Sequence, residues 1–167
     1  MTIGEKNRMK RIYLLLFAIS PMVIGYFVNL MALLPGIGVL LLYIASIILL
    51  IYWFWVGSKF ADAVSSPLLA VMGGNFFGIL SLFIYYWQFV ILDDHSRSMF
   101  WAGISQTFTT PLSIFTARIV VFFDKSPNTI SQTSITSMYV IGTLIMMVVF
   151  TIGYTFGKKK NKSTQGT

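Results

Sequence analysis

The side chains best suited to acid–base chemistry or metal binding lie together at one corner of the chain, Asp93-Asp94-His95. Carboxylates and an imidazole are metal ligands by type. Consecutive residues on a helix point in different directions, however, so a metal site would need a further ligand. Asp124 is the next acidic residue along the chain. A solvated helix end explains the three residues without a metal, and we predict no metal site.

The other residues and motifs that could support catalysis are few or absent. The chain has five acidic residues, one histidine and no cysteine, which excludes thiolate metal sites, thiol nucleophiles and disulfide bonds. The sequence contains no phosphate-binding loop, nucleophile elbow, zinc-protease motif or dinucleotide-binding motif. Its long apolar runs hold no Asp or Glu, so a proton relay inside a bilayer is not expected. We predict that the protein is not an enzyme and needs no cofactor.

Polar side chains recur along residues 100–123, an otherwise apolar segment. Its large apolar residues are three or four positions apart, which indicates one face of a helix. A polar stripe lies opposite, and an arginine lies near the end of the segment: Gln106, Thr109, Thr110, Ser113, Thr116 and Arg118. The segment either lies on a membrane surface or crosses the membrane with its stripe facing something other than lipid. In the second case the stripe would line a polar path.

Three amides interrupt the apolar runs: Asn29, Asn75 and Gln88. At about 1.5 Å of rise per residue, Asn29 and Gln88 fall in the outer part of a bilayer and Asn75 in the inner part. These depths allow Asn29 and Gln88 to meet between the first and third helices. Such a contact would be a hydrogen bond that helps packing or part of a polar lining for a substrate path.

Two pairs of glycines have the spacing that allows helices to approach closely. Gly74 and Gly78 lie within the third apolar run, and we predict that they pack inside the bundle, with a partner protein as the alternative. Gly153 and Gly157 lie where the last run ends, at the membrane edge, and are expected to matter less.

The elements that must position these residues are membrane helices. Of the 167 residues, 56% are hydrophobic and 10% are charged, whereas soluble domains carry about 25% charged residues. Crossing a bilayer takes roughly 20 apolar residues, which predicts spans at residues 12–34, 37–56, 68–92 and 138–156. Pro35-Gly36 predicts a tight turn, so the first two spans form an antiparallel hairpin. We expect a single membrane domain.

The positive charge is concentrated in two tails, residues 1–11 and 157–167. Eight of the twelve basic residues lie there: Lys6, Arg8, Lys10, Arg11, Lys158, Lys159, Lys160 and Lys162. Basic residues next to membrane spans mark the cytoplasmic side and attract anionic lipid. The charge therefore indicates a topology signal and not a nucleic-acid partner, and it places the N-terminus in the cytoplasm.

The predicted fold is an all-α integral membrane protein with four transmembrane helices plus one amphipathic segment, residues 100–123. The alternative is a five-helix bundle in which that segment also crosses. Four spans put both basic tails in the cytoplasm, and they avoid the cost of about 2.5–3.5 kcal/mol for a mid-membrane arginine.

Function is predicted only by class. The first expectation is a small non-catalytic protein of the plasma membrane with an accessory, regulatory or protective (immunity-type) role, acting through helix–helix and membrane-surface contacts. The alternative is a small transporter or channel subunit that uses the polar stripe. The lipid bilayer is the expected partner, and another membrane protein or a second copy of the chain is left open.

Overall fold

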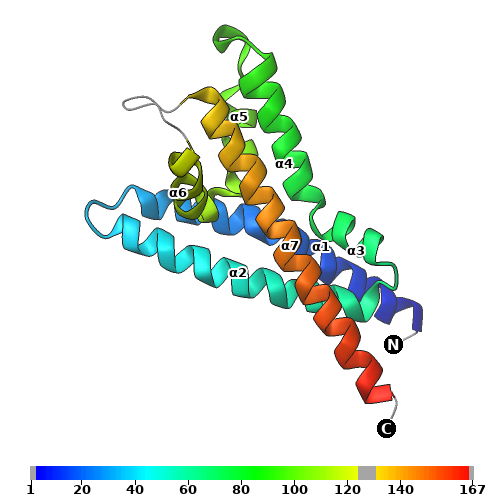
Figure 1. Cartoon of the computed structure of the whole chain (residues 1–167). Coiled ribbons are helices and arrows are strands. Elements are labelled where there is room, and N and C mark those ends of the chain that lie inside the picture. The colour runs from blue at the N-terminus through cyan, green and yellow to red at the C-terminus, as the bar shows by residue number, and fades with distance from the viewer. Residues whose placement is uncertain (1–2, 124–130, 166–167) are drawn as a thin grey trace.

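The computed structural model describes residues 3–123 and 131–165, and this part of the chain is helical throughout its regular structure (Figure 1). In chain order the elements are α1 (Ile3–Ala32), α2 (Gly38–Ala63), α3 (Pro67–Gly74), α4 (Phe76–Tyr86), the π-helical turn η1 (Trp87–Ile91), the 3-10 turn η2 (Asp94–Ser96), α5 (Met99–Thr107), the 3-10 turn η3 (Thr110–Leu112), α6 (Ser113–Phe123) and α7 (Gln132–Gln165).

Three of these helices are long and apolar enough to cross a membrane: Ile12–Ala32, Gly38–Ala63 and Gln132–Ser163. A fourth span results if the bent pair Pro67–Gly74 and Phe76–Ile91 counts as one. These findings confirm that the chain is an all-α integral membrane protein.

The first two spans form the predicted antiparallel hairpin, which turns at Gly36 with a positive φ of 76°. α2 does not end at residue 56 as predicted but continues to Ala63. Phe60 and Ala61 are buried there, and their packing keeps the last turns helical. Lys59 and Asp62 therefore lie on a helix and not in a loop.

The third predicted span, 68–92, is not one straight helix. α3 and α4 meet at Asn75 and are bent by 53°. The break follows Gly73 and Gly74 and falls on Asn75, three weak helix formers in succession. α3 begins at Pro67 after Ser66, the start that proline at a first helical position favours.

Contacts with α7 show that α3 and α4 together pass through the bundle. Near one end of α7, the Tyr154 hydroxyl donates to the carbonyls of Val64 and Ser65, just before α3, at 2.9 Å each. Near the other end, the rings of Tyr85 and Tyr139 lie 4.1 Å apart. The pair therefore runs antiparallel to α7, as a broken span.

α7 is longer than the predicted span 138–156, and it continues through the residues predicted to form a C-terminal tail. Its glycines meet α2 across a close crossing. A Cβ added to Gly153 would overlap the Phe54 carbonyl, and one added to Gly57 would overlap the Phe150 carbonyl. Gly157 likewise faces α2. The prediction that Gly153 and Gly157 matter less is therefore wrong, because helix ends still cross closely where both surfaces are small.

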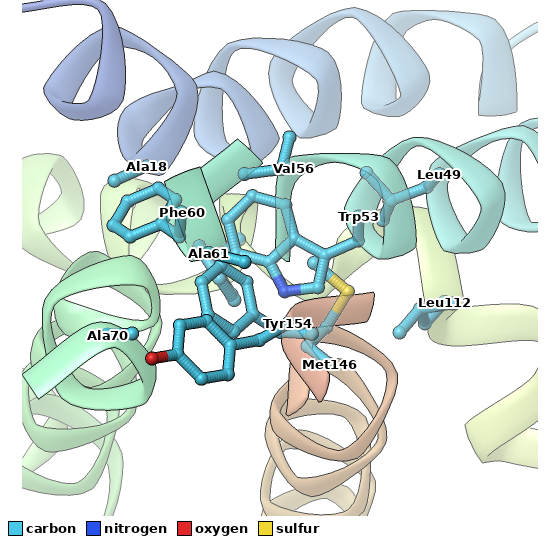
Figure 2. Close-up of a cluster of buried hydrophobic side chains, with 12 residues drawn as sticks. Ala18, Leu49, Trp53, Val56, Phe60, Ala61, Ala70, Leu112, Met146 and Tyr154 are labelled. Carbon is cyan, nitrogen blue, oxygen red and sulfur yellow. The ribbon is translucent and has the colours of Figure 1, made fainter. Parts of the chain in front are cut away.

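The core lies where α2, α3 and α7 cross (Figure 2). Trp53 is fully buried there, and its Nε1 donates to Asn75 Oδ1 at 3.3 Å. The Trp53 ring lies 5.6 Å from that of Phe150 and packs edge-to-face on Phe108, 5.9 Å away. Leu112 completes the same cluster. Phe108 and Leu112 belong to the predicted amphipathic segment, which therefore reaches the centre of the molecule.

Candidate functional site

The predicted amphipathic segment is not one continuous helix. It consists of α5 and α6, which are separated at Thr109 and the η3 turn. Pro111 lies within that turn; it lacks a backbone N–H and its ring collides with the preceding helical turn, so it breaks a helix. The apolar and polar faces predicted from a regular period therefore change direction at this point.

α5 runs antiparallel along the broken third span. At its start, the Ser98 backbone N–H donates to Gln88 Oε1 at 2.8 Å. Two turns later, Ser81 Oγ donates to the Ser105 carbonyl at 2.6 Å. Beyond that, the Phe108 ring fills the space beside Gly78. α5 therefore enters the bundle beside η1 and descends along α4 to its middle.

α6 returns toward the side from which α5 entered. Its Thr116 packs against Gly142 of α7. The ring of the neighbouring Phe115 lies 5.7 Å from that of Tyr43, and further along α6 Arg118 Nε donates to the Tyr43 hydroxyl at 3.3 Å. Tyr43 is in the second turn of α2, close to the hairpin turn.

Both ends of residues 99–123 consequently lie at the hairpin end of the bundle, and only the middle reaches the core. We call these residues the re-entrant segment. This arrangement corresponds to neither predicted alternative, because the segment neither lies on a surface nor crosses completely. It also leaves the beginning of α1 and the end of α7 at the same end of the molecule (Figure 1).

Side chains satisfy the backbone carbonyls at the turn of the re-entrant segment. Ser46 Oγ of α2 donates to the Pro111 carbonyl, and Ser81 Oγ donates to the Ser105 carbonyl, as described above. Thr110 Oγ1 donates to the Gln106 carbonyl at 2.7 Å. Irregular backbone at membrane depth is tolerated where it is buried in protein or lines a water-filled cavity, and these hydroxyls take the place of water as partners of the carbonyls. The roles of Ser46 and Ser81 were not predicted, since a hydroxyl in an apolar run does not reveal which carbonyl it will meet.

A polar cavity of about 120 Å³ opens behind this turn, between α1, α5, α6 and α7. It is lined by Asn29, Gln106, Thr109, Thr110, Ser113, Thr116, Met138 and Tyr139. The five uncharged residues of the predicted polar stripe thus converge on one space, and Asn29 joins them from α1. None of the lining residues carries a full charge. The volume suffices for a few water molecules or a solute of a few heavy atoms.

Arg118, the sixth residue of the predicted polar face, does not line the cavity. It is exposed and bonds to Tyr43 instead. Three lining or adjoining residues escaped prediction: Met138, Tyr139 and Gly142. Gly142 leaves room for Thr109 and Thr116 against α7. A small residue within an apolar run was the available signal for it.

The three intramembrane amides have separate roles. Asn29 lines the cavity, and Asn75 holds the bend by donating to the Val71 carbonyl at 2.9 Å and accepting from Trp53. Gln88 is fully buried. Its backbone carbonyl accepts a hydrogen bond from Arg97 Nε at 2.9 Å, and its side-chain Oε1 accepts one from the Ser98 backbone N–H. The contact between Asn29 and Gln88 that their depths allow does not occur, because α5 occupies the position beside Gln88.

The predicted packing glycines of the third span face the chain's own aromatic rings. Gly74 leaves room for the Phe150 ring, and Gly78 leaves room for the Phe108 ring. Their open faces are thus filled from within the same molecule.

The acidic corner at residues 93–95 forms a polar surface turn. Asp94 pairs with Arg97 at 2.8 Å, and the guanidinium lies 4.6 Å from the Phe89 ring. Within the described residues, no group of three or more His, Asp or Glu side chains is placed to hold a metal ion. Asp124 lies outside the described residues.

Fold and site together define a class: an all-α integral membrane protein with a re-entrant segment and an uncharged polar cavity inside the bundle. Comparisons with protein-family models, curated proteins and solved structures find no match for this chain.

Proposed function

We propose that the protein is a non-catalytic multi-pass protein of the plasma membrane that admits a small, uncharged polar solute into the cavity of its re-entrant segment, as a transporter or channel subunit. The observation that carries this proposal is the convergence of Gln106, Thr109, Thr110, Ser113 and Thr116 on one cavity.

The free-energy cost of placing polar groups and irregular backbone inside a membrane supports the proposed transport function. Polar groups in a hydrocarbon environment are expensive and tend to mark substrate or ion pathways. Irregular backbone at membrane depth likewise occurs where it lines a cavity, and discontinuous helices form the binding sites of many transporters. This chain combines two discontinuous helical segments with a polar cavity at one of the breaks.

The accessory role favoured by the sequence alone has less support from the contacts. It rested on the absence of catalytic motifs, on the packing glycines, for which a partner protein was the alternative, and on an amphipathic helix at the membrane surface. Gly74, Gly78, Gly153 and Gly157 instead face the chain's own side chains and backbone. The polar stripe is directed into the bundle.

The proposed orientation places both termini in the cytoplasm. The positive-inside rule favours it, since Lys59 and the lysines from Lys158 to Lys162 are at the end of the bundle where α1 begins and α7 ends. The cavity and the α1–α2 turn would then face the outer half of the bilayer.

Cysteine accessibility tests whether water-soluble molecules reach the cavity, because the native chain has no cysteine. We expect Ser113→Cys to react with a membrane-impermeant methanethiosulfonate added from outside. Leu144→Cys is the matched control, because Leu144 lies on α7 close to Gly142 in depth but is exposed on the outside of the bundle. Equal lack of reaction at both positions would contradict an accessible cavity.

Transport is tested separately by stopped-flow permeation of glycerol and urea into proteoliposomes. We expect Thr116→Val to slow permeation about fivefold, through loss of about 1 kcal/mol of hydrogen bonding. Thr151→Val removes a half-buried α7 hydroxyl outside the cavity and should leave permeation unchanged. Permeation no faster than in protein-free vesicles would exclude transport of these solutes.

A further inference from the structure

A second groove lies at the opposite end of the bundle from the α1–α2 turn, between the ends of α2 and α7. Its volume is about 320 Å³. It is lined by Phe54, Trp55, Ser58, Lys59, Asp62, Phe156, Gly157, Lys160 and Asn161. The glycine crossing described above brings the two helices together at its base.

The groove is apolar toward the bundle and basic toward the helix ends. Phe54 and Phe156 lie farther from the helix ends than the lysines and form its apolar part, with their rings 5.7 Å apart. Lys59 and Lys160 contribute the positive charge, and Lys59 Nζ lies 5.5 Å from the ring of Trp55. An amphipathic ligand of negative charge would meet complementary chemistry at each end.

Asp62 is the one acidic residue among those that line the groove, and its carboxylate accepts a hydrogen bond from Asn161 Nδ2 at 2.8 Å. The lining residues therefore carry one positive charge in excess. Lys158, Lys159 and Lys162 follow on the same helix end, and Lys158 Nζ is directed over the Tyr154 ring, 5.6 Å away. The surroundings add to the attraction for an anion.

We propose that this groove binds an anionic phospholipid, with the phosphate held between Lys59 and Lys160 and the upper acyl chains against Phe54 and Phe156. The position favours a lipid over a soluble anion, because the apolar part of the groove lies on the lipid-facing span surface and its basic part lies where that surface ends. This proposal is independent of the solute cavity.

Native mass spectrometry of the full-length protein in detergent, titrated with phosphatidylglycerol or phosphatidylcholine, tests the site. We expect wild-type protein to bind phosphatidylglycerol more tightly. Loss of one direct contact between a lysine and the phosphate costs roughly fivefold in affinity, so Lys59→Gln/Lys160→Gln should weaken binding by about 25-fold. Circular dichroism and gel filtration should show that this double variant and the control double variant are folded.

The control is Lys159→Gln/Lys162→Gln, which removes the same charge from exposed positions at the same helix end but outside the groove. We expect this pair to weaken binding by no more than about twofold. Equal losses in the two double variants would overturn the groove as a specific site and indicate diffuse attraction. Equal affinity for the two lipids, or displacement of phosphatidylglycerol by glycerol 3-phosphate alone, would overturn the proposal as well.

Discussion

At the scale of single residues, the glycines of the α2–α7 crossing set how closely the two longest packed spans approach. Gly57 and Gly153 each face a carbonyl of the other helix. No side chain fits between these backbones, so the crossing requires glycine at both positions. The crossing in turn holds Phe150 and Tyr154 in the core.

We predict that Gly153→Ala lowers the free energy of unfolding by about 1–3 kcal/mol, the usual cost of overpacking. Gly103→Ala is the control, because a Cβ there meets no atom within 4 Å. Alanine in place of glycine inside a helix is worth up to about 1 kcal/mol, so that variant should be neutral or more stable. Thermal unfolding in detergent, followed by tryptophan fluorescence, distinguishes them. Equal melting temperatures for the two variants would contradict the close crossing.

The bond between Trp53 and Asn75 joins the core to the bend of the third span. We predict that Asn75→Ala costs about 1–3 kcal/mol, because it leaves the buried Trp53 N–H unpaired. In a Trp53→Phe background the same change should cost less, since no N–H remains to be paired. A double-mutant cycle measures the difference, and a coupling energy of zero would show that the bond does not stabilise the bend.

At the scale of elements, the re-entrant segment depends on donors supplied by other helices. Ser46 and Ser81 come from α2 and α4, and both donate to carbonyls near the turn at Pro111. The turn is therefore held from two sides.

We predict that Ser46→Ala and Ser81→Ala each destabilise this turn locally by about 1–3 kcal/mol, since a buried carbonyl loses its partner. Faster amide hydrogen exchange around residues 105–112 would report it. Thr151→Ala provides the comparison, because Thr151 donates only within its own helix, to the Met147 carbonyl. If neither serine variant changes exchange at the turn, packing alone must hold it.

Sequence periodicity predicted which residues of this segment share a polar face but not where the face points. Gln106, Thr109, Thr110, Ser113 and Thr116 do gather in one place. The prediction assumed an unbroken helix, and Pro111 gave only a hint of a break. Whether the segment turns back depends on distant residues such as Gly78 and Gly142, which make room for it. No local pattern encodes that pairing.

At the scale of the whole molecule, the class of fold was predictable because composition and run length determine it directly. The ends of spans were less predictable. α2 and α7 continue past their apolar runs because Phe60 and Gly157 pack against neighbours there. The bend at Asn75 likewise joins a local weakness, Gly73-Gly74, to a tertiary hydrogen bond with Trp53. The weakness at Gly73-Gly74 can be seen in the local sequence, whereas the hydrogen bond to Trp53 depends on the fold.

The arrangement predicts which ends face which side of the membrane. A single cysteine at Thr133, in the first turn of α7, should react with an impermeant maleimide on intact cells. A cysteine at Ser163, near the end of α7, should react only after the cells are opened. Both positions are exposed, so reactivity reports the side of the membrane. The reverse pattern would invert the proposed orientation, and reaction at both positions in intact cells would contradict a spanning α7.

The central place of α7 also has a consequence for how the protein is made. α7 leaves the ribosome after each of the helices α2, α3, α4 and α6, which it contacts. Until it arrives, Gly57, Gly74 and Thr116 have no partner on that side. The hydroxyls of the re-entrant segment then face lipid or a membrane-insertion partner. We therefore expect an open intermediate during biogenesis, and we expect a chain stopped before residue 131 to be a substrate for membrane quality control.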